Sequence, residues 1–195
     1  MSGNARPRRR KPDRRVQRTR NLLGNALMVL IQEKPFDAIT VQELLDRAGV
    51  GRSTFYEYFR DKNDLFVSDL DEFLERIATA LAGHSDAGDR VAPVRELFGH
   101  VADSRQLYDA LVASGRIHDF LDLGRAHFAR GIEQRLVELT RARTLAPGRR
   151  AAVAHALAGA LLSLLLWWID GKRTASPEEM DDLFHGIVWS AVAAA

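Results

Sequence analysis

The stretch that decides the fold runs Ile39-Thr-Val-Gln-Glu-Leu-Leu-Asp-Arg-Ala-Gly-Val-Gly-Arg-Ser-Thr-Phe-Tyr-Glu-Tyr-Phe-Arg-Asp-Lys62. Thr40 and Glu43 have the spacing of a capping box, a pattern that opens a helix. Gly49 is placed to end that helix, and a second short helix is expected from about residue 52 to residue 59. Two short helices joined by a tight turn predict a helix-turn-helix.

The second of these helices is polar and aromatic on the face where a core helix would be apolar. Phe55 and Phe59, four residues apart, are expected to point inward together. Such an outer face fits the major groove of DNA, where base edges are contacted from the N-terminal part of the helix. The side chains expected to face bases are Arg52, Ser53, Thr54 and Tyr56, and those expected to hold phosphates are Thr40, Tyr58 and Lys62. The competing interpretation is a generic helical hairpin whose exposed face is polar.

Helical periodicity extends on both sides of this stretch. Apolar residues spaced by three and four predict a helix from about residue 14 to residue 34, which Pro35 ends. Later helices are expected at about residues 62–82, 93–103, 105–114, 117–142, 149–170 and 177–194. No run alternates with period two, so the expected fold class is all-α with about nine helices. We divide the chain into a disordered basic arm (residues 1–13), a DNA-binding head (residues 14–72) and a helical remainder (residues 73–195).

The formal net charge of +2 is unevenly distributed along the chain. Residues 1–70 hold 14 Lys and Arg against 9 Asp and Glu, whereas residues 71–195 hold 14 against 17. The N-terminal end is therefore the one expected to face a polyanion. Seven of its cations fall within residues 6–15. This arm could be an artefact or a solubilising tail, but we favour a contribution to DNA affinity.

Composition and motif content exclude several classes of protein. The chain has no cysteine, which excludes disulfides and Cys-ligated zinc. Its histidines lack the spacing of a metal site, so no metal is expected. We find no nucleophile elbow, P-loop or dinucleotide-binding loop, and we therefore expect neither an enzyme nor a cofactor. No apolar segment follows the first charges, so no signal peptide is expected and the expected location is the cytoplasm.

A longer pattern surrounds the two short helices: Thr40-x-x-x-Leu44-Leu45-x-x-Ala48-Gly49-Val50-Gly51-x-Ser53-Thr54-Phe55-Tyr56-x-Tyr58-Phe59-x-Asp61-Lys62-x-Asp64-Leu65. It resembles the signature of the TetR family of transcriptional regulators, and the resemblance covers residues 16–70. The resemblance implies a homodimer whose recognition helices enter successive major grooves of a near-palindromic operator, and a C-terminal ligand pocket coupled to the DNA heads. Gly51 stands where many members have Ser, and a glycine still serves as an N-cap.

Residues 151–169 include no charged residue. Their length makes them a candidate membrane span, but their alanine content, His155 and Ser163 favour a buried helix of a soluble domain. A helix that is apolar all round must be buried all round, and one face could pack on a second subunit. Together with the last helix, this segment predicts a four-helix dimer interface. The residues expected in that interface are Leu161, Leu165, Trp168, Phe184, Ile187, Val188 and Ala191.

The helices between the head and this interface mix apolar and polar residues and could line a ligand pocket. The candidate lining residues are His100, Tyr108, His118, His127, Ser163 and Trp167. For each histidine alone, a solvated or internally satisfied side chain is the competing interpretation. For each aromatic residue, the competing interpretation is plain hydrophobic core.

The sequence thus predicts a homodimeric DNA-binding regulator of transcription, a repressor that a small, mostly apolar ligand releases from double-stranded operator DNA. Two alternatives stay open. One is a DNA-organising or division-linked protein of the same fold without a small-molecule inducer. The other is a protein anchored in a membrane through residues 151–169.

Overall fold

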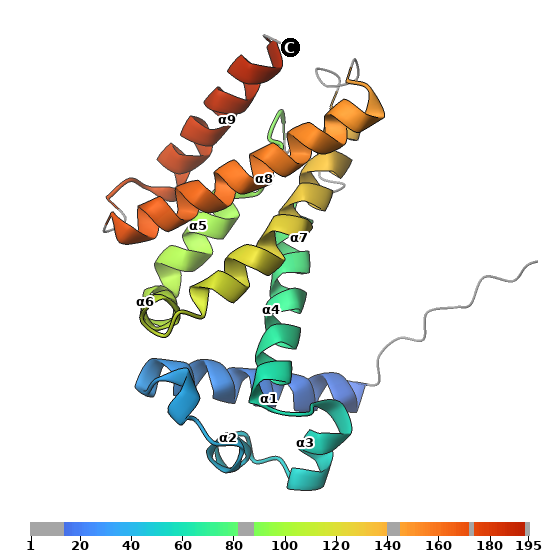
Figure 1. Cartoon of the computed structure of the whole chain (residues 1–195). Helices are drawn as coiled ribbons and strands as arrows, with labels where there is room; N and C mark the ends of the chain where they lie inside the picture. The colour runs from blue at the N-terminus through green and yellow to red at the C-terminus, as the bar shows by residue number, and fades with distance from the viewer. Residues whose placement is uncertain (1–13, 82–87, 140–144, 172–173, 194–195) are drawn as a thin grey trace, which may run out of the picture. The chain divides into compact units, whose positions relative to one another are not determined.

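The computed structural model describes residues 14–81, 88–139, 145–171 and 174–193. Every element within these ranges is a helix, which confirms the predicted all-α fold class. The elements are α1 (Arg14–Glu33), the 3-10 turn η1 (Phe36–Ala38), α2 (Val41–Ala48), α3 (Arg52–Tyr58), α4 (Lys62–Ala78), α5 (Val94–Asp103), α6 (Arg105–Ala113), α7 (Ile117–Glu138), α8 (Pro147–Asp170) and α9 (Pro177–Ala193) (Figure 1). The predicted basic arm lies outside the described residues.

Two helices end earlier than the periodicity predicts. α4 ends at Ala78 because the amide of Ala80 donates to the carbonyl of Ile77 at 3.0 Å, a tighter bond than the α-helical one. α7 ends at Glu138, where Leu139 turns to an extended conformation with φ −80° and ψ 127°. Apolar periodicity alone does not show either change of backbone geometry.

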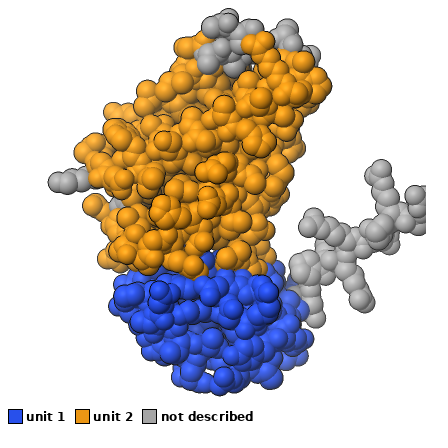
Figure 2. Space-filling view, viewed as in Figure 1, with its two compact units in different colours: residues 1–66 blue, residues 67–195 orange. Residues whose placement is uncertain are grey.

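The chain divides into two compact units, residues 1–66 and residues 67–195, called here the first and second unit (Figure 2). α4 contributes to both, since it begins at Lys62 and ends at Ala78. The sequence predicts a boundary between residues 72 and 73, between a DNA-binding head and the helical remainder. That boundary divides the chain by function, whereas the two units divide it by compactness, and it stays a prediction.

The core of the first unit joins α1, α2 and α3. Leu27 of α1, Leu44 of α2 and Phe55 of α3 have no exposed surface, as their helical spacing predicts. Gly49 ends α2 in the left-handed conformation with a φ of 64°, which any side chain disfavours. The buried residues and this turn together hold α2 and α3 as a helix-turn-helix.

The second unit is built around α7 and α8, which pack along each other, while α5 packs on α9 (Figure 1). The rings of Phe98 in α5 and Trp168 in α8 lie 4.9 Å apart. α7 meets the end of α4 at Gly131. A Cβ at this position would overlap the carbonyl oxygen of Ala78, so the crossing depends on glycine.

α8 is the helix that we expected to be buried all round. By length and composition alone it is apolar enough to cross a membrane, a property that the core helix of a soluble protein can share. Only 39% of its most apolar 18-residue window is buried within this chain. The remaining face includes Trp167, which is 61% exposed. One chain therefore covers one side of α8 and leaves the other open.

Candidate DNA-binding surface

α3 presents one face to the core and the other to solvent. Phe55 and Phe59 are 0% and 3% exposed, which confirms that they point inward. The predicted base contact Thr54 is half-buried. The other three predicted base contacts are exposed, namely Arg52, Ser53 and Tyr56.

Arg52 and Tyr56 form a pair along the exposed face of α3. The guanidinium carbon of Arg52 lies 5.7 Å from the centroid of the Tyr56 ring, a cation–π contact. A guanidinium holds its donors in one plane, the form that can bond two acceptors of a guanine. Glu57 is also exposed on this helix and could accept from a cytosine amine. This face therefore offers both donors and an acceptor to base edges.

The capping box predicted at the start of α2 is present. The Thr40 hydroxyl accepts from the Glu43 amide at 3.2 Å and donates to the Glu43 carboxylate at 2.9 Å, and the Thr40 amide donates to the same carboxylate at 2.9 Å. Lys34 pairs with Glu43 as well. Hydrogen bonds from Lys34 and then Thr40 lower the pKa of Glu43 to about 2. The hydroxyl proton of Thr40 is thus directed at Glu43, and the donors that a phosphate could use here are the first amides of α2.

Lys62 is the first residue of α4, as the sequence predicts, but its ammonium points to backbone oxygens. It donates to the carbonyl oxygens of Phe36 at 2.8 Å, Asp37 at 3.0 Å and Ile39 at 2.7 Å. The ammonium also lies 4.9 Å from the centroid of the Phe36 ring. Because an ammonium has three donors, this arrangement uses all of them. In the chain without DNA the ammonium is thus taken up by backbone oxygens, and the predicted phosphate contact stays a prediction.

Arg20 of α1 is a cation that the sequence analysis did not single out. Its guanidinium carbon lies 5.1 Å from the centroid of the Phe59 ring, so α1 places a positive charge near the C-terminal end of α3. Tyr58, a predicted phosphate contact next to Phe59, is half-buried. Arg20 stands far upstream of the motif, and no spacing within the motif could have identified it.

In the described part of the second unit, the six predicted pocket residues differ in exposure and in contacts. Tyr108 is buried, with its ring 5.9 Å from that of His100 and 5.8 Å from that of Phe120. Burial raises the pKa of Tyr108 and lowers that of His100. Tyr108 is therefore core. Three of the predicted residues are exposed, namely His118, Ser163 and Trp167.

His127 is buried between α4 and α7. Its Nε2 lies 2.8 Å from Oδ1 of Asp71, and its Nδ1 lies 2.9 Å from Oε2 of Glu75. Arg130 donates to the same Glu75 oxygen at 3.2 Å. Hydrogen bonds from His127 and then Arg130 lower the pKa of Glu75. This histidine thus ties two helices together, and its predicted role as a pocket residue stays a prediction.

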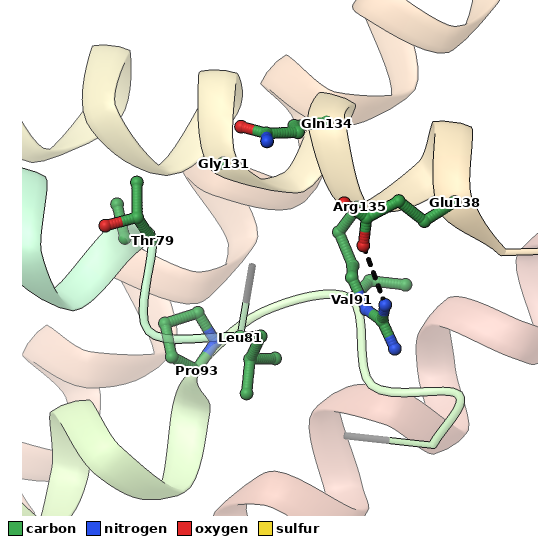
Figure 3. Close-up of a pocket in the computed structure, with 9 residues that line it drawn as sticks. Thr79, Leu81, Val91, Pro93, Gly131, Gln134, Arg135 and Glu138 are labelled. Carbon is green, nitrogen blue, oxygen red and sulfur yellow. Dashed lines mark hydrogen bonds and ion pairs between the residues drawn. The ribbon is translucent and has the colours of Figure 1, made fainter. Parts of the chain in front are cut away.

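One small cavity lies at the end of α4, against α7 and the segment that precedes α5 (Figure 3). It has room for about one water molecule. Arg135 and Glu138 form an ion pair beside it at 2.8 Å. The cavity shares no residue with the predicted pocket. Its lining residues are Ala78, Thr79, Leu81, Val91, Pro93, Gly131, Gln134, Arg135 and Glu138.

Most of the predicted dimer residues are covered within one chain, and their place in a dimer interface stays a prediction. The apolar stripes of α8 and α9 contact the chain's own α7 and α5. Ile187 is 57% exposed, and Ala191 lies outside the residues whose side chains are described. The buried members are Leu161, Leu165, Trp168, Phe184 and Val188. Large apolar side chains that α8 and α9 do expose are Trp167, Leu183 and Ile187.

Sequence comparison identifies relatives of the helix-turn-helix. The profile of the family described as bacterial regulatory proteins, tetR family, matches residues 25–68. A relative in Bacillus subtilis (strain 168), the uncharacterized HTH-type transcriptional regulator YxbF, is 23% identical over 173 residues. That alignment covers 86% of this chain and 43% of YxbF, so the chain spans less than half the length of this curated relative.

Comparison with solved structures identifies the same fold. DhaS, described as a dihydroxyacetone kinase operon activator, aligns with a TM-score of 0.64 and 15% identity over 90% of this chain and 97% of its own. A TetR transcriptional regulator from Streptococcus agalactiae aligns with a TM-score of 0.63 and 24% identity over 90% and 96%. NalD of Pseudomonas aeruginosa, described as a secondary repressor of an efflux pump, aligns with a TM-score of 0.53 and 21% identity over 89% and 96%. The helix-turn-helix of this chain, residues 25–68, therefore matches the tetR family of bacterial regulatory proteins, and the described fold matches solved structures of TetR regulators.

Proposed function

We propose that this chain is a transcriptional regulator that binds specific double-stranded DNA through α3. The exposed face of α3 carries the proposal: Arg52, Ser53 and Tyr56 lie outward while Phe55 and Phe59 anchor the helix. Base edges in a major groove accept such a helix. A regulator of this kind acts where the DNA is, and we therefore place it in the cytoplasm.

A pair of arginine variants tests the proposal. The probe is a 30-base-pair duplex that the wild-type chain selects from a random-sequence pool, and affinity is measured by fluorescence anisotropy. Arg52→Ala is expected to weaken binding about five- to a hundredfold, because one good base contact contributes about 1–3 kcal/mol. Arg125→Ala is the control, since it removes one exposed cation from α7. Equal affinities for both variants would contradict the proposed role of Arg52, and failure of the wild type to enrich any duplex would contradict the function.

We propose that the chain acts as a homodimer through the apolar residues that α8 and α9 leave exposed. Trp167, Leu183 and Ile187 are 61%, 48% and 57% exposed, and large apolar side chains at the surface favour contact with a partner. Ile187→Glu should lower the mass in sedimentation equilibrium towards that of one chain. Val137→Glu on α7, which is 53% exposed, should leave the mass unchanged. A wild type that sediments as a monomer would contradict the proposal, and partition of the chain into the membrane fraction would favour anchoring through α8.

We propose further that the protein represses transcription until a small, mostly apolar molecule binds the second unit. Relatives of this fold include a described activator, DhaS, and a described repressor, NalD, so the direction of control needs its own test. A reporter gene behind the selected duplex should rise in expression when this chain is deleted. Genome-wide binding at one or two promoters would support a regulator, and many scattered sites would support a DNA-organising protein.

A further inference from the structure

We propose that Lys62 is a positioning residue of the DNA-binding surface, which holds the start of α2 in place and takes no phosphate itself. This inference rests on the proposed function, because it concerns how α2 and α3 are presented to DNA. It assigns Lys62 a role that differs from the phosphate contact expected from the sequence.

The ammonium of Lys62 closes the turn that leads into α2. η1 is held by hydrogen bonds from the Ala38 amide to Pro35 at 2.9 Å and from the Ile39 amide to Phe36 at 3.1 Å. The carbonyls of Phe36, Asp37 and Ile39 converge on the Lys62 ammonium at 2.7–3.0 Å. Hydrogen bonds from an ionised donor are about twice as strong as neutral ones. One side chain at the start of α4 thus satisfies three carbonyls of a single turn.

The next residue after this turn is the N-cap of α2, so the turn sets where α2 begins. Ile39 is bound by Lys62, and Thr40 directly follows it as the N-cap. Lys34, just beyond the end of α1, pairs with Glu43 of the capping box. The first turn of α2 is therefore fixed from α1 through Lys34 and from α4 through Lys62. Phosphate contacts at such a helix end set the register of a protein on its duplex.

Transfer of the ammonium to a phosphate would remove this donor from the carbonyls of Asp37 and Ile39 and leave that of Phe36 with the Ile39 amide alone. A phosphate contact and a positioning role therefore predict different dependences on salt. Each phosphate that a cation neutralises makes the slope of log affinity against log salt concentration more negative by about 0.9. A positioning residue changes affinity at every salt concentration and leaves the slope unchanged.

The test measures binding of the full chain to its selected 30-base-pair duplex between 50 and 300 mM KCl. Lys62→Met keeps the length of the side chain and removes the ammonium, and we expect binding about tenfold weaker with the wild-type slope. Arg60→Met is the charge-matched control, because the side chain of Arg60 is 87% exposed and its guanidinium pairs with Asp64. A slope that becomes less negative by about 0.9 in Lys62→Met, but not in Arg60→Met, would overturn the inference while leaving the proposed function intact.

Lys62→Arg decides the question if the methionine variant does not fold, as judged by circular dichroism. A planar guanidinium binds phosphate well but cannot direct three donors from one atom to the three carbonyls. Positioning predicts weaker binding with an unchanged slope, and faster hydrogen exchange of residues 36–43 in the free protein. Wild-type affinity and exchange in Lys62→Arg would overturn the inference. A wild-type chain that binds no duplex would overturn the proposed function, and this inference with it.

Discussion

The two units use polar side chains in opposite ways. In the first unit, the exposed face of α3 turns arginine, serine and tyrosine towards solvent, above a core of phenylalanine and leucine. In the second unit, charged side chains turn inward and neutralise one another. Arg90 donates to Glu96 at 2.6–2.9 Å and to Asp181 at 2.7–3.1 Å. Arg52 of the first unit is thus available to a partner, whereas Arg90 of the second unit holds the fold.

The distance along the chain between interacting groups also differs. Thr40 and Glu43 are three residues apart, so a short pattern reveals their interaction. Arg90 and Asp181 are 91 residues apart, and Val91 donates to His185 across 94 residues. A pattern confined to one helix carries no information about such pairs. This is why the function of the first unit is easier to infer than that of the second.

Phe55→Ala should have the largest effect among the variants that test this contrast. It removes a fully buried ring from the first unit, which we expect to cost about 3–5 kcal/mol of unfolding free energy and to abolish DNA binding. All three tryptophans, at positions 167, 168 and 189, lie in the second unit, so their fluorescence monitors that unit alone. In urea, circular dichroism should show an early transition while the fluorescence midpoint stays in place.

Phe98→Ala is the matched control, because Phe98 is equally buried in the second unit. Here the fluorescence midpoint should move. If Phe55→Ala shifts the fluorescence midpoint as far as Phe98→Ala does, the units unfold together and the contrast between them does not extend to stability.

Arg90→Leu should have the next largest effect, about 2–3 kcal/mol, because it removes the guanidinium that pairs with both Glu96 and Asp181. The side chain of Arg90 is 19% exposed, and that of Asp181 is 13% exposed. Arg95→Leu is the control, since Arg95 is half-exposed and lies 3.6 Å from Glu96. Urea unfolding followed by tryptophan fluorescence measures both variants. Similar midpoints would show that the buried network adds little to stability.

Thr40→Ala should cost about 1 kcal/mol, the usual effect of losing a helix N-cap. Thr40→Ser keeps the hydroxyl and should restore most of that loss. Circular dichroism during urea unfolding measures the effect, since the change lies in the first unit. A serine variant as unstable as the alanine variant would indicate that the methyl group of Thr40, not its hydroxyl, matters.

The pH dependence of the second unit should give a smaller effect with a defined sign. Burial acts to raise the pKa of Asp181, but hydrogen bonds from His185 and Arg90 prevail and lower it well below 3.8. The folded state therefore binds the Asp181 proton more weakly than the unfolded state does. Its stabilising contribution is present above pH 3.8 and declines as the pH falls below that value.

Asp181→Asn checks this sign, because it removes the titrating group. Unfolding free energies between pH 3 and pH 7 should decline less steeply in Asp181→Asn than in the wild type. A decline of equal steepness in both proteins would assign the acid sensitivity to other carboxylates.

The sequence predicts the elements of this fold well, because caps, prolines and apolar spacing act within a few residues. It also predicts which side of α3 is buried. What it does not predict is what lies against a side chain. Leu161 and Val188 show the expected apolar stripes, but periodicity does not say whether the same chain or a partner buries them. The three carbonyls around Lys62 are equally hidden, because backbone atoms have no sequence signature.

The contact between Gly131 and the backbone of Ala78 has a consequence for how this protein can change over generations. Most residues in a packed interior can be replaced by amino acids of similar size. Position 131 has no such replacement, since every other amino acid adds the Cβ that the Ala78 carbonyl excludes. A replacement here would survive only if the end of α4 had already moved. We therefore expect mutational libraries of this chain to retain glycine at position 131 whenever the protein remains folded, whichever DNA sequence the library is selected to bind.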